Sequence, residues 1–229
     1  MIRFGTIGTN WITERFLHAA AENDDFELTA VYSRTEEKGL EFAAQFGEPK
    51  VYTDLKAMAT KRLHRRGLYR QPELPLHAEQ AILFMNHGKH VLREKPLASN
   101  SDEVRRMIAA AEANNVVLME AMKSTLMPNF RIMKDNPYKI GQVRRYFASY
   151  CQYSSRYDAF KQGTVLNAFN PEFSNGALMD LGIYCIYPAG VLVRQTGRSQ
   201  SARRHAFFRR GRGRQRHWRY PEMDARHVF

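Results

Sequence analysis

The chain has 229 residues, of which 44% are hydrophobic, 12% aromatic and 25% charged. These values are typical of globular proteins and exclude collagen, coiled-coil and low-complexity classes, and the length allows one large domain or one and a half. Cys151 and Cys185 are too few for a disulfide framework, and the N-terminus lacks the apolar segment of a secretory signal. We therefore expect a reducing, cytoplasmic setting, and we interpret the weakly polar stretch 176–193 as buried protein, not membrane.

The net charge of +12 is unevenly distributed along the chain. Residues 61–75 and 194–229 hold 16 of the 35 Lys and Arg but only three of the 23 acidic residues. The body of the chain is therefore close to neutral, unlike a basic nucleic-acid-binding domain. Nucleic-acid binding through the Arg-rich tail 194–229 is a hypothesis that rests on charge alone.

Strand-like and helix-like patterns alternate through residue 120. Predicted strands at 3–7, 26–32, 90–92 and 116–119 are separated by segments with helical spacing of apolar residues, such as 77–86. This alternation predicts the α/β class, with a Rossmann-type doubly wound parallel sheet that binds ligands beyond the carboxyl ends of its strands. We therefore expect Gly8, Ser33 and Glu94 to face a site.

The alternation stops beyond Glu120. Residues 142–153 are a long strand-like run without a crossover helix, and residues 175–188 are an apolar, helix-like segment. We predict two domains, a Rossmann domain at 1–120 and an incomplete α+β domain at 121–229.

The segment Gly8-Thr9-Asn10-Trp11-Ile12 joins the first predicted strand to the first helix. A glycine at this place lets the chain turn sharply, so that backbone N–H groups at the start of the helix can hold a pyrophosphate. Asn10 and Thr13 stand where the dinucleotide motif has its second and third glycines, so an ordinary strand–helix turn is the alternative interpretation.

Ser33 and Arg34 follow the second predicted strand, and Lys38 lies one helical turn later. Folds that bind NAD carry an acidic residue here for the ribose hydroxyls, whereas a hydroxyl and two cations suit a 2′-phosphate. The pattern favours NADP, with NAD possible. An exposed arginine at a helix start is the alternative interpretation of Arg34.

The motif Glu94-Lys95-Pro96 follows the strand at 90–92, and Gly176-Ala177-Leu178-Met179-Asp180-Leu181-Gly182-Ile183-Tyr184 lies downstream. With the turn after Gly8, these motifs resemble the Gfo/Idh/MocA oxidoreductases, which include glucose-fructose oxidoreductase, inositol dehydrogenase and dimeric dihydrodiol dehydrogenase. The resemblance covers residues 1–60 and 76–193. It implies an enzyme that transfers a hydride between NAD(P) and a sugar, polyol or dihydrodiol-like alcohol, with a dinucleotide-binding first domain and a second domain for substrate and dimerisation.

The resemblance also implies roles for single residues. Lys95 would hydrogen-bond the reacting oxygen, and Tyr184 would be the general acid/base, as in the glucose-fructose oxidoreductase and dihydrodiol dehydrogenase branch. Asp180 would orient Tyr184 or a substrate hydroxyl, because it lies four residues earlier on the same helical face.

Further residues follow from the same resemblance. Asn10, Trp11 and Ile12 would lie along the phosphates and ribose of the cofactor, and Glu94 would reach the nicotinamide ribose. Lys123 would line the substrate pocket or be solvated. His77 matches a histidine of the family, with a structural role at a helix start as the alternative. No metal is implied, and an intact relative would form a homo-oligomer.

Residues 61–75 conflict with the resemblance, because a relative needs a buried central strand there. Five cations with Gly67 and Pro72 argue against such a strand, since each unpaired buried charge is costly. We hypothesise a frame slip at 61–75 and another in 194–229, with a truncated second domain. The alternatives to an active oxidoreductase are an inactive remnant with weak nucleotide binding and a nucleic-acid binder.

Overall fold

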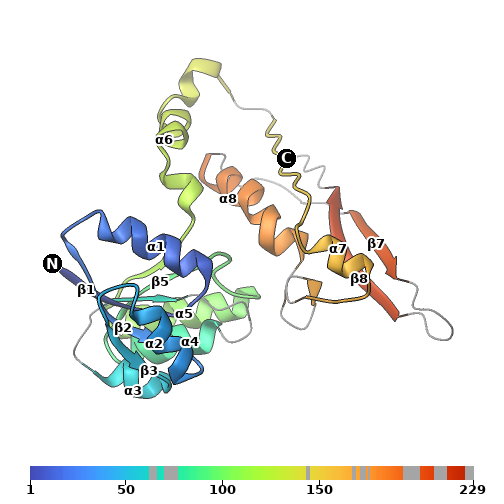
Figure 1. The fold of residues 1–229 in the computed structure, drawn as a ribbon. Helices are drawn as coiled ribbons and strands as arrows, with labels where there is room; N and C mark the ends of the chain where they lie inside the picture. The colour runs from blue at the N-terminus through green and yellow to red at the C-terminus, as the bar shows by residue number, and fades with distance from the viewer. Residues whose placement is uncertain are drawn as a thin grey trace. The chain divides into compact units, whose positions relative to one another are not determined.

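The computed structural model describes residues 1–61, 77–142, 145–166, 169–170, 174 and 176–192, and the backbone of 66–69, 202–208 and 216–224. The chain divides into two compact units, Met1–Ala121 and Met122–Phe229 (Figure 1). None of the described helices is long and apolar enough to cross a membrane.

The first unit contains a six-stranded parallel sheet with the order β3-β2-β1-β4-β5-β6. Its strands are β1 (Ile2–Ile7), β2 (Phe26–Tyr32), β3 (Lys50–Tyr52), β4 (Arg66–Tyr69), β5 (His90–Arg93) and β6 (Leu118–Glu120). The direction of the strand order reverses between β1 and β4, which is the doubly wound arrangement. The predicted Rossmann-type α/β fold is confirmed.

Helices cover both faces of this sheet. They are α1 (Trp11–Ala21), α2 (Glu36–Ala43), α3 (Leu55–Thr60), α4 (His77–Asn86) and α5 (Ser101–Ala113). Alternate residues of a strand point to opposite faces, so the sheet contributes to two separate apolar clusters. The cluster with α1 and α2 contains Phe4, Leu17, Val31 and Phe42. The cluster with α3, α4 and α5 contains Ile7, Ala30, Met58, Phe84 and Met107 among others.

The segment 61–75 does supply a central strand, so the expectation that no strand could form there is wrong, whereas the burial of its side chains lies outside the described residues. The backbone of Arg66–Tyr69 forms β4, which pairs in parallel with β1 and with β5. Backbone groups make the ladder, and only one of the five cations, Arg66, falls within the four paired residues, while Pro72 lies outside them. The frame-slip hypothesis concerns the gene and stays a prediction.

The second unit consists mainly of short helices in the part that the structure describes. They are η2 (Lys123–Leu126), α6 (Pro128–Asp135), η3 (Pro137–Ile140), α7 (Tyr157–Lys161), the π-helical turn η6 (Leu178–Gly182) and α8 (Ile183–Leu192). The last two confirm the helix-like segment after residue 175, and α8 continues past Pro188. Strands β7 (Ala202–Phe208) and β8 (Arg216–Asp224) form an antiparallel pair within the segment 194–229.

The strand predicted at 142–153 is absent from the described residues of that run, so this prediction is wrong. A strand is stable only where a neighbouring strand supplies backbone partners. Both described strands of this unit pair with each other in a two-stranded sheet. Phe147 in this run is 84% exposed.

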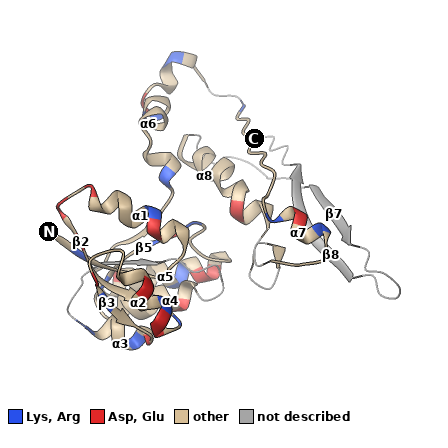
Figure 2. Ribbon diagram, in the orientation of Figure 1, with Lys and Arg blue, Asp and Glu red and all other residues tan. Residues whose placement is uncertain are grey.

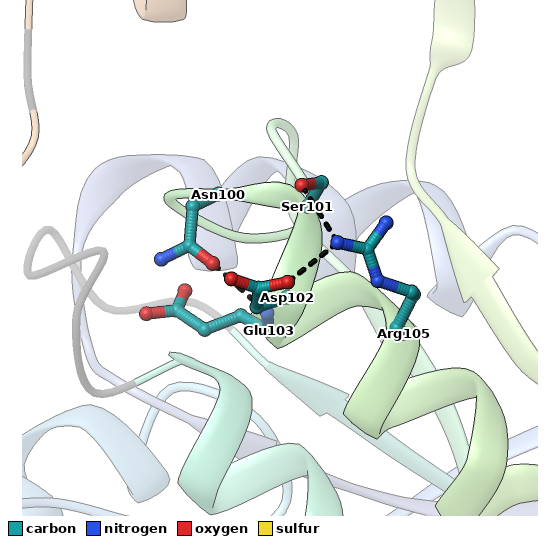
Figure 3. A network of polar contacts seen from close by, with 5 residues as sticks. All are labelled: Asn100, Ser101, Asp102, Glu103 and Arg105. Carbon is teal, nitrogen blue, oxygen red and sulfur yellow. Dashed lines mark hydrogen bonds and ion pairs between the residues drawn. The ribbon is translucent and has the colours of Figure 1, made fainter.

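Polar side chains hold the N-terminus of α5 (Figure 3). The Asn100 side chain accepts a hydrogen bond from the N–H of Glu103 at 2.9 Å, and Arg105 donates to Ser101 and Asp102. The carboxylate of Glu103 accepts the N–H of Ser99 at 2.9 Å. These bonds cap the helix at Asn100 and also fix Ser99, the residue just before the cap.

Gly39 lies where α2 meets β3. A Cβ added to Gly39 would be 2.4 Å from Val51 Cγ1 and 3.2 Å from Ser33 Cβ. We expect Gly39→Ala to lower the free energy of unfolding by about 1–3 kcal/mol, because crowding outweighs a gain of about 1 kcal/mol in helix propensity. Urea unfolding measures the change.

Gly190→Ala in α8 is the matched control, because no described atom lies within 4 Å of its added Cβ. It should be neutral or stabilising by up to about 1 kcal/mol. An equal change in both variants would contradict the close approach at Gly39.

Candidate functional site

The carboxyl ends of the central strands β1, β2, β4 and β5 are in register along one edge of the sheet. Ile7 of β1 is in register with Tyr32 of β2 and Tyr69 of β4, and Tyr69 is in register with Arg93 of β5. The residues that follow three of these strands, Gly8, Ser33 and Glu94, therefore lie along one edge of the sheet. This edge includes the switch point between β1 and β4, where doubly wound sheets bind ligands.

Gly8 makes the turn from β1 into α1. Its φ of 96° lies in the left-handed region that favours glycine, and its N–H donates to Tyr32 O at 3.1 Å. Asn10 is the N-cap of α1, and its side-chain oxygen accepts from the N–H groups of Ile12 at 3.1 Å and Thr13 at 3.4 Å. The polar residue in the second glycine position thus stabilises the helix start.

The turn fits a dinucleotide. Thr13 is 2% exposed, and its hydroxyl has no hydrogen-bond partner among the described residues, so a polar atom lies beside the helix N-terminus. Helix N-termini attract anions such as a pyrophosphate. Since Asn10 already occupies the N–H groups of Ile12 and Thr13, a phosphate would use other donors of the turn. Trp11 is 54% exposed, with the Arg15 guanidinium 4.9 Å from its ring centroid.

Of the three predicted site residues after β2, one is buried and two are exposed cations. Ser33 is buried, and its N–H donates to Tyr52 O of β3 at 3.0 Å. Arg34 and Lys38 are exposed, at the residue after Ser33 and within the first turns of α2. Both cations can meet a phosphate from solvent, whereas Ser33 holds the strand end.

The Glu94-Lys95-Pro96 motif forms a bend between β5 and α5. Glu94 and Lys95 are half-buried, and the peptide bond between Lys95 and Pro96 is cis. The Arg93 carbonyl accepts the N–H of Ala121 at 2.6 Å. This bend lies at the same sheet edge as the turn after Gly8.

Glu120 contacts this bend, although the sequence analysis assigned it no role. Its carboxylate accepts the N–H of Leu97 at 2.8 Å from the end of β6. Burial raises the pKa of Glu120, and the hydrogen bond from Leu97 opposes that rise. An acidic residue at a predicted strand end is the signal that could have found it.

His77 is the first residue of α4 and is 3% exposed. Its burial at a helix start agrees with the structural alternative, and its match to the family histidine stays a prediction.

Three predicted site residues belong to the second unit. Lys123 is exposed at the start of η2, Asp180 is exposed in η6, and Tyr184 is half-buried at the start of α8. The Tyr184 ring stacks on Tyr150, with centroids 5.7 Å apart and an interplanar angle of 30°. The pairing of Tyr184 with Lys95 of the first unit stays a prediction.

Asp180 and Tyr184 lie in one helical segment that changes from π to α geometry at Ile183. The N–H of Asp180 donates to Gly176 O at 2.9 Å, and this hydrogen bond closes the helical turn from Gly176 to Asp180. Single π-helical turns inside helices are frequent at functional sites. The expectation that the two side chains share one helix face also stays a prediction.

Charges of both signs are spread over the described helices (Figure 2). Arg106 pairs with Glu79 between α5 and α4, and Lys161 pairs with Asp158 at 2.7 Å within α7. The side chains of the Arg-rich tail 194–229 lie outside the described residues, so nucleic-acid binding stays untested. Within the described residues, no group of three or more His, Cys, Asp or Glu could hold a metal ion.

Comparison with known proteins gives a family match over residues 2–122. The matching family is Gfo/Idh/MocA, described as an oxidoreductase family with an NAD-binding Rossmann fold.

Curated relatives match over a longer part of the chain. The scyllo-inositol 2-dehydrogenase (NADP(+)) IolU of Bacillus subtilis is 62% identical over 192 residues, which cover 84% of this chain and 58% of the relative. The trans-1,2-dihydrobenzene-1,2-diol dehydrogenase of Xenopus laevis is 32% identical, over 80% of this chain and 54% of the relative. The chain thus spans little more than half the length of these proteins.

A solved structure shares the fold. The 3-ketoreductase KijD10 of Actinomadura kijaniata, in complex with NADP and TDP-benzene, has a TM-score of 0.72 and 28% identity. The match covers 84% of this chain and 57% of that protein.

The cap of α1 gives a prediction for the turn after Gly8. Asn10→Ala removes the acceptor for the N–H groups of Ile12 and Thr13, and we expect it to lower the free energy of unfolding by about 1 kcal/mol. Asn10→Ser, which keeps a capping oxygen, should lose much less. Denaturant titration of both variants tests this, and equal losses would contradict a capping role for Asn10.

Proposed function

The chain belongs to the Gfo/Idh/MocA family of oxidoreductases, and on that premise we propose that it binds NADP and transfers a hydride to or from a sugar or cyclic polyol. The observation that carries the proposal is the register of the sheet. The carboxyl ends of β1, β2 and β5 lie along one edge, and Gly8, Arg34 and Lys95 follow these strand ends. The named activity of the inositol dehydrogenase relative supports a cyclic polyol as the substrate class.

Cofactor binding is assigned to the first unit. The turn from Gly8 to Ile12 would hold the pyrophosphate, and the exposed cations Arg34 and Lys38 would hold the 2′-phosphate that distinguishes NADP from NAD. Glu94, half-buried beside Lys95, would reach the nicotinamide ribose. When bound there, the nicotinamide accepts or supplies the hydride.

The protein's own groups handle the proton and the oxygen charge. In the oxidation direction, the hydroxyl of the substrate loses its proton while its carbon loses a hydride. The ammonium of Lys95 would donate a hydrogen bond to the reacting oxygen and stabilise the developing negative charge. Tyr184 would take the proton as general base, and the reverse direction returns it as general acid.

Asp180 and Lys123 complete the proposed substrate side. Both are exposed in the second unit, and Asp180 lies one helical turn before Tyr184. Asp180 would orient Tyr184 or accept a hydrogen bond from a substrate hydroxyl, and Lys123 would donate to one. The proposal includes a homo-oligomer in a reducing compartment, the cytoplasm, which agrees with the free thiols of Cys151 and Cys185.

Lys95→Met tests the catalytic assignment, because it removes the charge but keeps the length of the side chain. We expect kcat for scyllo-inositol oxidation to fall at least about 100-fold, while NADPH binding changes less than about threefold. Cofactor fluorescence gives the binding constant, and absorbance of the reduced cofactor gives kcat. Lys56→Met, at an exposed position of α3, is the control.

Failure of the unmodified chain to bind NADPH at millimolar concentration would contradict the proposed function. Binding of NADPH without turnover of inositols or sugars would instead favour the inactive nucleotide-binding remnant.

Arg34→Ala tests the choice of cofactor. Loss of a charge-assisted bond to the 2′-phosphate should weaken NADPH binding about tenfold or more and leave NADH binding nearly unchanged. Fluorescence titration with both cofactors measures the ratio, and Arg131→Ala, exposed on α6, is the matched control. Equal weakening for NADPH and NADH would contradict recognition of the phosphate by Arg34.

A further inference from the structure

We infer that Glu120 is a positioning residue that fixes the backbone around Lys95 by accepting the N–H of Leu97. The inference rests on the proposed function, because it concerns the residue to which the proton and charge chemistry is assigned. Glu120 itself need not touch substrate or cofactor.

The bend that carries Lys95 is tied to β6 at both of its ends. Arg93 and Glu120 are register partners in the parallel ladder between β5 and β6, and the Arg93 carbonyl accepts the N–H of Ala121 at 2.6 Å. At the other end, the N–H of Leu97 donates to Glu120 Oε1 at 2.8 Å. Glu120 and Ala121, which are adjacent at the end of β6, thus hold both ends of the bend. The residues between the two anchored positions are Glu94-Lys95-Pro96.

Leu97 is the natural place for the second anchor. Proline has no N–H, so Leu97 is the first residue after Lys95 whose backbone can donate a hydrogen bond. The next anchored residue, Ser99, donates its N–H to Glu103 at 2.9 Å and therefore belongs to the start of α5. The Glu120 side chain thus ties the bend to the sheet, whereas Glu103 ties Ser99 to the helix that follows.

The chemistry of Glu120 agrees with an acceptor role. Burying a carboxylate costs free energy, and here burial raises its pKa, so an unneeded acid at this position would destabilise the fold. Both the ionised and the protonated carboxyl keep an oxygen that accepts from an N–H. A glutamine amide offers the same oxygen without the charge, which separates the hydrogen bond from the electrostatics.

Glu120→Ala, Glu120→Gln and Glu120→Asp test the inference, with Glu112→Ala, at an exposed position of α5, as the control. The first readout is exchange of the Leu97 amide hydrogen, followed by NMR in protein labelled with 15N-leucine. The second is kcat, measured together with the NADPH dissociation constant.

We expect Glu120→Ala to speed Leu97 exchange at least about tenfold and to lower kcat about 10- to 100-fold, with the NADPH dissociation constant within about threefold, because small misplacement of a catalytic group is costly. Glu120→Gln should restore the slow exchange and most of kcat. Glu120→Asp, which keeps the charge but is one methylene shorter, should resemble Glu120→Ala and serves in its place if that variant does not fold.

Two results would overturn the inference: unchanged Leu97 exchange in Glu120→Ala, or a Glu120→Gln variant as impaired as Glu120→Ala in both readouts. Absence of turnover in the unmodified protein would remove the proposed function instead. In that case the amide exchange still decides whether Glu120 holds the bend.

Discussion

The parallel register of β1 with both β2 and β4 is the constraint on which the candidate site depends. It places Ile7, Tyr32 and Tyr69 at the same level, so the chain leaves neighbouring strands at one edge. Strand β4 has a further role, because β5 reaches β1 only through it. Without β4, the bend that carries Lys95 would have no fixed position relative to the turn after Gly8, and a common binding site for one dinucleotide could not form.

A side-chain hydrogen bond links the C-terminus of α3 to the residue before β5, on either side of the segment that contains β4. Lys89 is buried, and its ammonium group donates to the carbonyl of Lys61 at 2.7 Å. Lys61 is the C-cap of α3, where helix carbonyls lack internal partners and favour a cation. This bond joins the first residue of the cationic segment 61–75 to the residue just before β5.

Local patterns predicted the elements whose own sequence carries clear apolar spacing. The strand at 26–32 and the helix at 77–86 match the observed bounds, because each carries its own apolar spacing. Strand β4 and the run at 142–153 were misjudged for one shared reason: strand formation depends on pairing with distant segments, which composition does not report. The role of Glu120 was missed similarly, because the register of β6 against β5 brings it to Leu97, 23 residues earlier in the chain.

The candidate site residues divide between the two units. Every residue assigned to the cofactor, with Lys95, lies in Met1–Ala121, whereas Tyr184, Asp180 and Lys123 lie in Met122–Phe229. The bonds that hold the cofactor edge, from Gly8 to Tyr32, from Ser33 to Tyr52 and from Leu97 to Glu120, are all made within the first unit. The proposed nucleotide binding therefore draws on residues of the first unit alone. The proposed proton transfer needs residues of both units, because the proposal assigns Lys95 of the first unit and Tyr184 of the second to the same step. A change in the second unit should accordingly alter turnover before it alters the affinity for the cofactor.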